Sequence, residues 1–166
     1  SGAHTATLTI ANRTVSNSGT NYYVVINGPA NDPTSVTVTL NVNTTPSVNI
    51  TSLPQSVCYT GGTATFTALG SGSFTGYKWQ YSSDDVNYSD VVTGTPTGVS
   101  YIGSNTDSLI VTTTAATPVA GPHYYRVVVL ASTPCVDSES LGSQLIINDP
   151  TITTNPVAAG VVAGGT

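Results

Sequence analysis

Apolar and polar residues alternate along short segments of this chain, and a period of two indicates β-strands with one buried face. In the segment 63–69, Ala64, Phe66 and Ala68 fall on one face and threonines on the other. Gly, Pro, Asn and Asp separate these segments and are typical of turns. No window has the 3.6-residue period of an amphipathic helix, so the sequence predicts an all-β fold.

Between residues 46 and 149 the alternating segments follow one another at the spacing of sandwich strands. The first expected strand is split, because Pro54 removes a backbone donor between two short runs. In the segment 123–130, the pattern predicts that Tyr125, Val127 and Val129 point inward. The expected strands are 47–51, 55–58, 63–69, 76–82, 86–92, 99–102, 108–112, 123–130 and 144–148.

Parts of this pattern occur twice. Leu8 and Leu109 are 101 residues apart and begin similar apolar runs; Tyr23 and Tyr125 are 102 residues apart and begin similar strands. Near the other end, the Gly-Gly-Thr at 61–63 recurs at 164–166. An offset of about 100 residues is the length of one sandwich domain, so we expect tandem repeats.

The phase of the repeat divides the chain into three parts. Residues 1–45 carry the pattern of the last strands of a preceding repeat, 46–149 form one complete unit, and 150–166 form a linker and the first strand of the next repeat. A few isolated strands cannot bury an apolar face, so we expect a longer array. The alternative is a polymer subunit whose exposed edge is completed by another chain's strand.

The composition and charge of the chain argue against two classes of function, nucleic-acid binding and membrane insertion. Charged residues make up 7% of the chain, against about 25% in an average soluble domain, and the net charge is -5. The basic residues Arg13, Lys78 and Arg126 are scattered, so no cluster favours nucleic acid. The sequence has no apolar run of about 18 residues, so it does not predict direct membrane insertion.

Three features resemble the immunoglobulin-like antiparallel β-sandwich. Phe66 precedes Trp79 by 13 residues, the usual interval between an inward strand residue and the core tryptophan of such domains. Tyr125 stands two residues before Val127, as in a tyrosine corner. The strands with Tyr23 and Tyr125 both follow a turn that contains Gly. The expected structural core is Phe66, Trp79, Leu109, Tyr125 and Val127.

The runs 58–66, 77–82 and 125–129 more narrowly resemble the repeats of very large surface proteins of the Bacteroidota. These include gliding-motility adhesins and other substrates of the type IX secretion route. The resemblance implies an extracellular, cell-surface location and a role in adhesion or filament formation. This chain differs from its relatives at 84–88, where Asp84-Asp85-Val86 and Tyr88 replace an Asp-Gly-Gly turn and a second Trp.

Cys58 and Cys135 are the only cysteines. Two thiols in an exported domain usually form a disulfide, and in the resembled repeats cysteines at these two places tend to occur together. An immunoglobulin topology nevertheless places them near opposite ends, and a bridge requires Cα atoms within about 7 Å. We expect an internal Cys58–Cys135 disulfide; a bridge to a neighbouring domain and free thiols are the alternatives.

Candidate catalytic and metal residues are few. His4 and His123 have no partners at metal-ligand spacing, and the acidic run 84–90 is typical of turns rather than of a calcium loop. No Ser lies in a Gly-x-Ser-x-Gly motif, and Glu139 is the only glutamate. The sequence therefore predicts a protein that is not an enzyme and has no catalytic, metal or cofactor site.

Other side chains are candidates for contact or modification. Asp107-Ser108-Leu109 matches a short O-glycosylation pattern of the Bacteroidota, which makes Ser108 a candidate acceptor. Four Asn-x-Ser/Thr sequons matter only in a eukaryotic source. The tyrosines expected on the contact surface are Tyr22, Tyr88, Tyr101 and Tyr124.

These observations favour a stiff extracellular spacer or adhesive stalk in a large surface adhesin or filament. Its partners would be neighbouring repeats of the same chain, with surface glycans or other surface proteins bound through distal domains. Short linkers at 43–46 and 148–150, each with a proline, would keep the units in line. The alternatives are an accessory or carbohydrate-binding module of a secreted multidomain protein, the strand-exchanging subunit, and a eukaryotic adhesion receptor.

Overall fold

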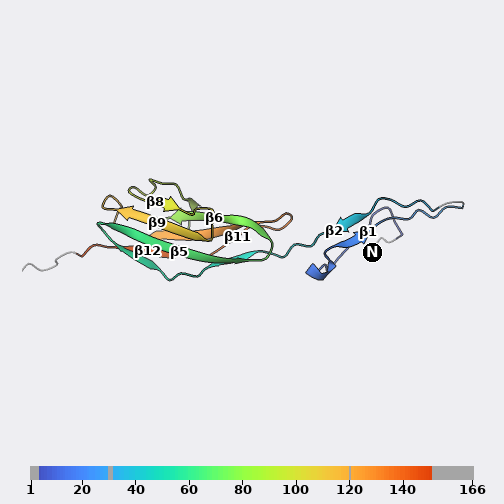
Figure 1. The fold of residues 1–166 in the computed structure, drawn as a ribbon, viewed down its shortest axis with the longest axis horizontal. Helices are drawn as coiled ribbons and strands as arrows, with labels where there is room; N and C mark the ends of the chain where they lie inside the picture. The colour runs from blue at the N-terminus through green and yellow to red at the C-terminus, as the bar shows by residue number, and fades with distance from the viewer. Residues whose placement is uncertain (1–3, 30–31, 120, 151–166) are drawn as a thin grey trace, which may run out of the picture.

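A computed structural model describes residues 4–29, 32–119 and 121–150 (Figure 1). These residues form an all-β structure whose only helical element is the 3-10 turn η1 (Val15–Asn17). In chain order the strands are β1 Thr20–Tyr22, β2 Val38–Leu40, β3 Ser47–Ile50, β4 Gln55–Cys58, β5 Gly61–Ser71, β6 Phe74–Ser82, β7 Ser89–Asp90, β8 Ser100–Ile102, β9 Ser108–Thr114, β10 His123–Ala131, β11 Ser138–Glu139 and β12 Ser143–Asn148.

The strands from β3 to β12 form two sheets, which we call the two-sheet unit (residues 46–150). One sheet has the order β4-β12-β10-β6-β7, with β11 paired to β10; the other has the order β3-β5-β9-β8. Every pairing is antiparallel except that of β12 with β4. The chain changes sheets between β3 and β4, at the break that Pro54 predicts, and so contributes an edge strand to each sheet.

Alternation of apolar and polar residues accounts for the packing of the sheets. In β5, Ala64, Phe66 and Ala68 are buried while the threonines between them are exposed. In β10, Tyr125, Val127 and Val129 are each 0% exposed. Successive side chains of a strand point to opposite faces, so each sheet directs one apolar face toward the other.

An aromatic cluster occupies the centre of this core. The five residues expected there, Phe66, Trp79, Leu109, Tyr125 and Val127, are each 0% exposed. The ring centroids of Phe66 and Tyr125 are 5.1 Å apart, and those of Phe66 and Trp79 are 6.4 Å apart. The Trp79 indole donates to the carbonyl oxygen of Thr106 at 2.8 Å, which satisfies its polar atom inside the core.

Residues 4–45 form a separate element, which we call the N-terminal ribbon and which lies beyond one end of the two-sheet unit (Figure 1). Its strands β1 and β2 pair antiparallel, and Val25 and Thr34 form an isolated bridge. Large apolar side chains remain exposed along it, including Tyr23 at 65% and Val38 at 64%. The ribbon therefore has the sequence pattern of a half-buried sheet without a second layer.

Three differences from the expected strands change the architecture. The arm expected at 86–92 is reduced to β7, because residues 83–87 form a turn around Asp84. The short β11 was not expected, and 7–10 form no strand. The linker and first strand expected at 150–166 lie outside the described residues, apart from Pro150.

Candidate functional site

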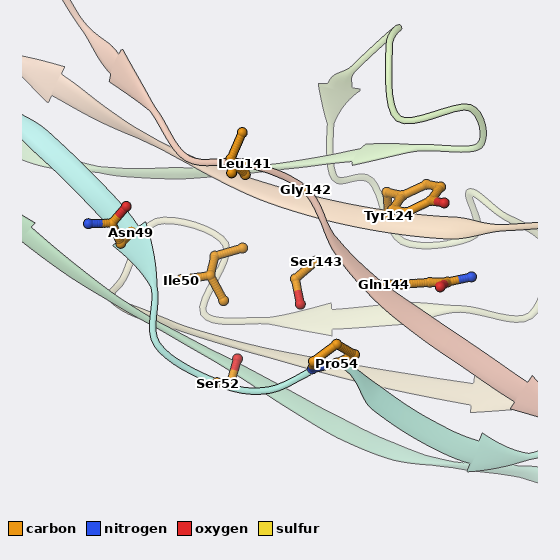
Figure 2. A pocket seen from close by; sticks show the side chains of 9 residues that line it. All are labelled: Asn49, Ile50, Ser52, Pro54, Tyr124, Leu141, Gly142, Ser143 and Gln144. Atoms are coloured by element: carbon orange, nitrogen blue, oxygen red, sulfur yellow. The ribbon is translucent and has the colours of Figure 1, made fainter.

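A groove opens where the first strand changes sheets (Figure 2). β3 ends at Ile50 in one sheet and β4 begins at Gln55 in the other, so the chain between them leaves a gap beside the segment 141–143. The groove has a volume of about 390 Å³. It is lined by Asn49, Ile50, Ser52, Pro54, Tyr124, Leu141, Gly142, Ser143 and Gln144.

A second depression of about 330 Å³ adjoins the first and shares Leu141 and Gly142 with it. At its centre the Arg126 guanidinium lies 4.2 Å from the centre of the Tyr88 ring, a cation–π contact. Arg126 Nη1 is 2.9 Å from Glu139 Oε2, and Arg126 Nε donates to Gln80 Oε1 at 2.9 Å. Three contacts thus fix the guanidinium on the outer face of the sheet.

This network continues across the sheet. The other end of the Gln80 amide donates to Asp90 Oδ1 at 2.9 Å, which lowers the pKa of Asp90, and Lys78 Nζ is 3.4 Å from the same oxygen. The resulting chain of side chains, which we call the polar ladder, crosses β11, β10, β6 and β7. Its members are Glu139, Arg126, Gln80, Asp90 and Lys78.

Gly142 allows the turn before β7 to close on the depression. A Cβ atom at residue 142 would collide with Asp85 Oδ1 and with the Tyr88 hydroxyl. That hydroxyl donates to Asp85 Oδ1. Burial, followed by this hydrogen bond and the Asp85 charge, raises the pKa of Tyr88, so the phenol remains protonated at neutral pH.

The acidic run 84–90 has a local structural explanation. Asp84 accepts hydrogen bonds from the backbone N–H groups of Asn87 at 2.7 Å and Val86 at 2.9 Å, from the Asn87 amide and from the Ser82 hydroxyl. These bonds, that of the Asn87 backbone first, hold the pKa of Asp84 well below its usual range. Within residues 4–29, 32–119 and 121–150, no three His, Cys, Asp or Glu side chains are grouped as a metal site would require.

Both cysteines are free thiols in the structure, which does not contain the expected Cys58–Cys135 disulfide. Cys58 ends β4 and is paired with Asn148, beyond the start of β10. Cys135 follows the end of β10, and its Sγ atom lies 3.7 Å from the Thr44 carbonyl oxygen. The length of β10, about 26 Å at 3.3 Å per residue, therefore separates them, far more than the roughly 7 Å that a bridge allows.

The tyrosines expected at the surface have different environments. Tyr88 and Tyr124 line the two depressions, and Tyr22 is half-buried in the ribbon. Tyr101 packs against Tyr125 and donates to the Thr95 carbonyl oxygen at 2.9 Å; burial raises its pKa to about 12. Tyr101 is thus part of the rim of the core rather than of a contact surface.

The remaining candidates are placed by their strands. His123, at the start of β10, is buried, with Nε2 2.9 Å from the Pro118 carbonyl oxygen and Nδ1 3.2 Å from the Tyr81 hydroxyl. His4 lies in the exposed part of the ribbon. Ser108 begins β9 and is half-buried beside the exposed Asp107.

The linker at 43–46 is held by two turns of the two-sheet unit. The Asn43 side chain donates to the Thr133 carbonyl oxygen at 2.7 Å. Thr44 N donates to Ser73 Oγ at 3.0 Å, and Ser73 N donates back to the Thr44 carbonyl oxygen at 3.1 Å. These residues form the junction between the ribbon and the two-sheet unit.

The contacts of the polar ladder were not predicted from the sequence, because its members come from distant segments. One local signal was available: Arg126 is a charged residue at an outward-facing position of a strand that is otherwise mostly apolar.

The sequence matches no model of a known protein family and no curated protein at a significant level. Among the described residues, no helix is long and apolar enough to cross a membrane.

Proposed function

We propose that this chain is a non-catalytic segment of a tandem array of immunoglobulin-like sandwiches and serves as a stiff extracellular spacer. Strand order supports the immunoglobulin-like part. The order β3-β5-β9-β8 corresponds to the A-B-E-D sheet of that fold, and β12-β10-β6 corresponds to its G-F-C sheet. Trp79, on the C-equivalent strand, packs against Phe66 as the core tryptophan of such domains would.

The observation that carries the array is the likeness of the ribbon to the last strands of the two-sheet unit. Leu8 and Tyr23 match Leu109 and Tyr125 in the repeat, yet they are 49% and 65% exposed where their counterparts are 0% exposed. β1 pairs antiparallel with β2 as β10 pairs with β12. The ribbon thus has the inner face of a sandwich, and we propose that strands of a preceding repeat cover it.

Stiffness follows from the junction. A flexible linker would have its polar backbone in water, whereas the N–H and carbonyl groups of Thr44 are both hydrogen-bonded to Ser73. The Asn43 side chain adds a hydrogen bond to the Thr133 carbonyl oxygen. Pro46 is buried and restricts the backbone further. We place the array outside the cell and with the Bacteroidota surface proteins that it resembles. Its direct partners are its own neighbouring repeats.

The first test is the mass of the native protein. In the surface fraction of the source organism, peptides from this chain are expected in a species much larger than 16.9 kDa that contains further repeats. Mass spectrometry with peptide mapping measures this. A native species close to 16.9 kDa would contradict the array and favour the strand-exchanging subunit.

A second test supplies the missing strands. Residues 46–106, which contain β3 to β8, are fused as a second copy ahead of the ribbon, with the junction before Asp107 matched to the one before Thr5 or Ala6. The ribbon amides are then expected to become protected from hydrogen exchange, as in β10. The control is the same fusion carrying Trp79→Ala in the added copy only, which should leave the ribbon unprotected. Equal exchange in both fusions would contradict the proposal.

A further inference from the structure

The two depressions beside Gly142 adjoin each other and form one continuous surface. They share Leu141 and Gly142, and together they extend from Asn49 and Pro54 to Arg126 and Glu139. Tyr124 and Gln144 are direct neighbours on β10 and β12, and both line the larger of the two depressions (Figure 2). We call this surface the Gly142 groove. It is open to solvent rather than enclosed, which suits an extended ligand better than a fully buried small molecule.

The polar side chains of the Gly142 groove are held in place before any ligand arrives. Arg126 is fixed by Glu139, by Gln80 and by the Tyr88 ring, and Tyr88 is fixed by Asp85. Side chains that are already ordered lose little conformational entropy on binding. Glu139 is 58% exposed, and its second carboxylate oxygen has no hydrogen-bond partner among the described residues.

The charges of the Gly142 groove disfavour an anionic ligand. The positive charge of Arg126 is balanced by Glu139 at 2.9 Å, so the groove lacks the unpaired cations that bind phosphate or sulfate groups. Asp85 accepts a hydrogen bond from the Tyr88 hydroxyl, which occupies this carboxylate without balancing its negative charge. The groups still available to a ligand are the second Glu139 carboxylate oxygen, an acceptor, and the neighbouring Arg126 N–H groups, which are donors. Adjacent hydroxyl groups of a sugar ring present the matching pattern of donors and acceptors.

The apolar part of the groove is consistent with the same ligand. Tyr124 and Leu141 border it, and Leu141 is 90% exposed. An aromatic ring can pack on the C–H face of a pyranose while its hydroxyl remains in water. A peptide that adds a strand requires a free sheet edge. β10, which carries Tyr124 and Arg126, is paired on both edges, so only the edge strand β3, which carries Asn49 and Ile50, could accept one.

We propose that the Gly142 groove binds a neutral oligosaccharide, with Tyr124 packing on one sugar ring and with Glu139 and Arg126 hydrogen-bonding the hydroxyls of the next. This gives the two-sheet unit a binding role of its own, independent of whether the ribbon belongs to an array. Gly142 is a shaping residue, because any larger side chain would displace Tyr88 and Asp85.

The test is an amide NMR titration of the whole chain with three neutral probes in turn: cellohexaose, laminarihexaose and mannohexaose. At least one is expected to shift the amides of residues 85–88, 124–126 and 139–144, with a Kd of about 0.1–1 mM. Tyr124→Ala is expected to weaken that binding at least about fivefold, and Glu139→Gln about threefold.

The matched control is Tyr59→Ala, which removes an exposed tyrosine from the loop after β4, outside the groove. It is expected to bind with unchanged affinity. The dispersed amide spectrum of each variant establishes that it is folded. The proposal is overturned if no probe shifts these amides at about 10 mM, or if Tyr124→Ala binds as tightly as Tyr59→Ala.

Discussion

The N-terminal ribbon and the two-sheet unit have similar sequences but opposite environments. Tyr23 and Tyr125 are 102 residues apart and stand in similar runs of apolar and polar residues. Tyr125 lies against Phe66, Tyr81 and Tyr101 and is 0% exposed, whereas Tyr23 is 65% exposed. The pattern alone therefore specifies a strand with an apolar face, and burial depends on the sheet opposite.

The largest expected effect compares these two tyrosines directly. Tyr125→Ala should lower the free energy of unfolding by about 3–5 kcal/mol, because it leaves a cavity among packed rings. Tyr23→Ala should change it by less than about 0.5 kcal/mol. Urea unfolding followed by the fluorescence of Trp79, the only tryptophan, measures both. Similar losses in the two variants would contradict the structural difference between the regions.

The next effect concerns the junction between the regions. Gly72 has a positive φ of +85°, and a Cβ there would collide with the Thr45 carbonyl oxygen and with Pro46 Cα. Gly72→Ala should lower the free energy of unfolding by about 1–3 kcal/mol and release the linker. Small-angle scattering should then show a broader range of end-to-end distances.

Gly94→Ala is the matched control for that variant. Its φ is also positive, +91°, but nothing lies within 4 Å of the added Cβ. It carries the backbone strain without the collision, and its scattering profile should remain that of the unaltered chain. If Gly94→Ala broadened the profile as much as Gly72→Ala, the junction contacts would not account for the proposed stiffness.

High pH should weaken the two-sheet unit through its buried tyrosines. Burial raises the pKa of Tyr101 to about 12 and raises that of Tyr125 as well, while both ionise near pH 10 in the unfolded chain. Below pH 10 both states hold these protons, so stability is unaffected; above it the unfolded state loses them first, and stability falls.

For Tyr101 the loss should be about 1.4 kcal/mol per pH unit between pH 10 and 12. Urea unfolding at intervals of pH measures the slope. Tyr101→Phe removes this ionisable group and should give a shallower slope. An unchanged slope would mean that Tyr101 is not the group responsible.

The smallest effect on the free energy of unfolding is expected for the polar ladder, on the outer face of the six-stranded sheet. Glu139→Gln breaks the ion pair with Arg126 and should lower the free energy of unfolding by less than about 1 kcal/mol, because the carboxylate is largely in water. Thermal unfolding measures this. A loss of several kcal/mol would mean that the polar ladder is part of the stabilising core and not a surface network.

Local periodicity was sufficient to predict most strands. β4 coincides with its expected range, and the ranges of β3, β8 and β12 differ from expectation by one residue at one end. The inward parity of Tyr125, Val127 and Val129 agrees with their burial. Such features depend on side chains that alternate along one strand, which the sequence displays directly.

Features that depend on contacts between distant segments were not predictable. β11 is only two residues long and has no apolar alternation of its own. The contact of Arg126 with Glu139 depends on the path of residues 132–138, which no local pattern specifies. In the ribbon, nothing within the segment distinguishes a strand with a covering layer from one without it.

The two thiols of the two-sheet unit are natural attachment points for single-molecule force measurements. Cys58 and Cys135 lie at opposite ends of the six-stranded sheet, and both are partly accessible. A force applied between them would act along the strands, at right angles to hydrogen bonds such as those between β10 and β12. The bonds would then be loaded together in shear instead of opening one after another, which is the geometry that resists pulling best.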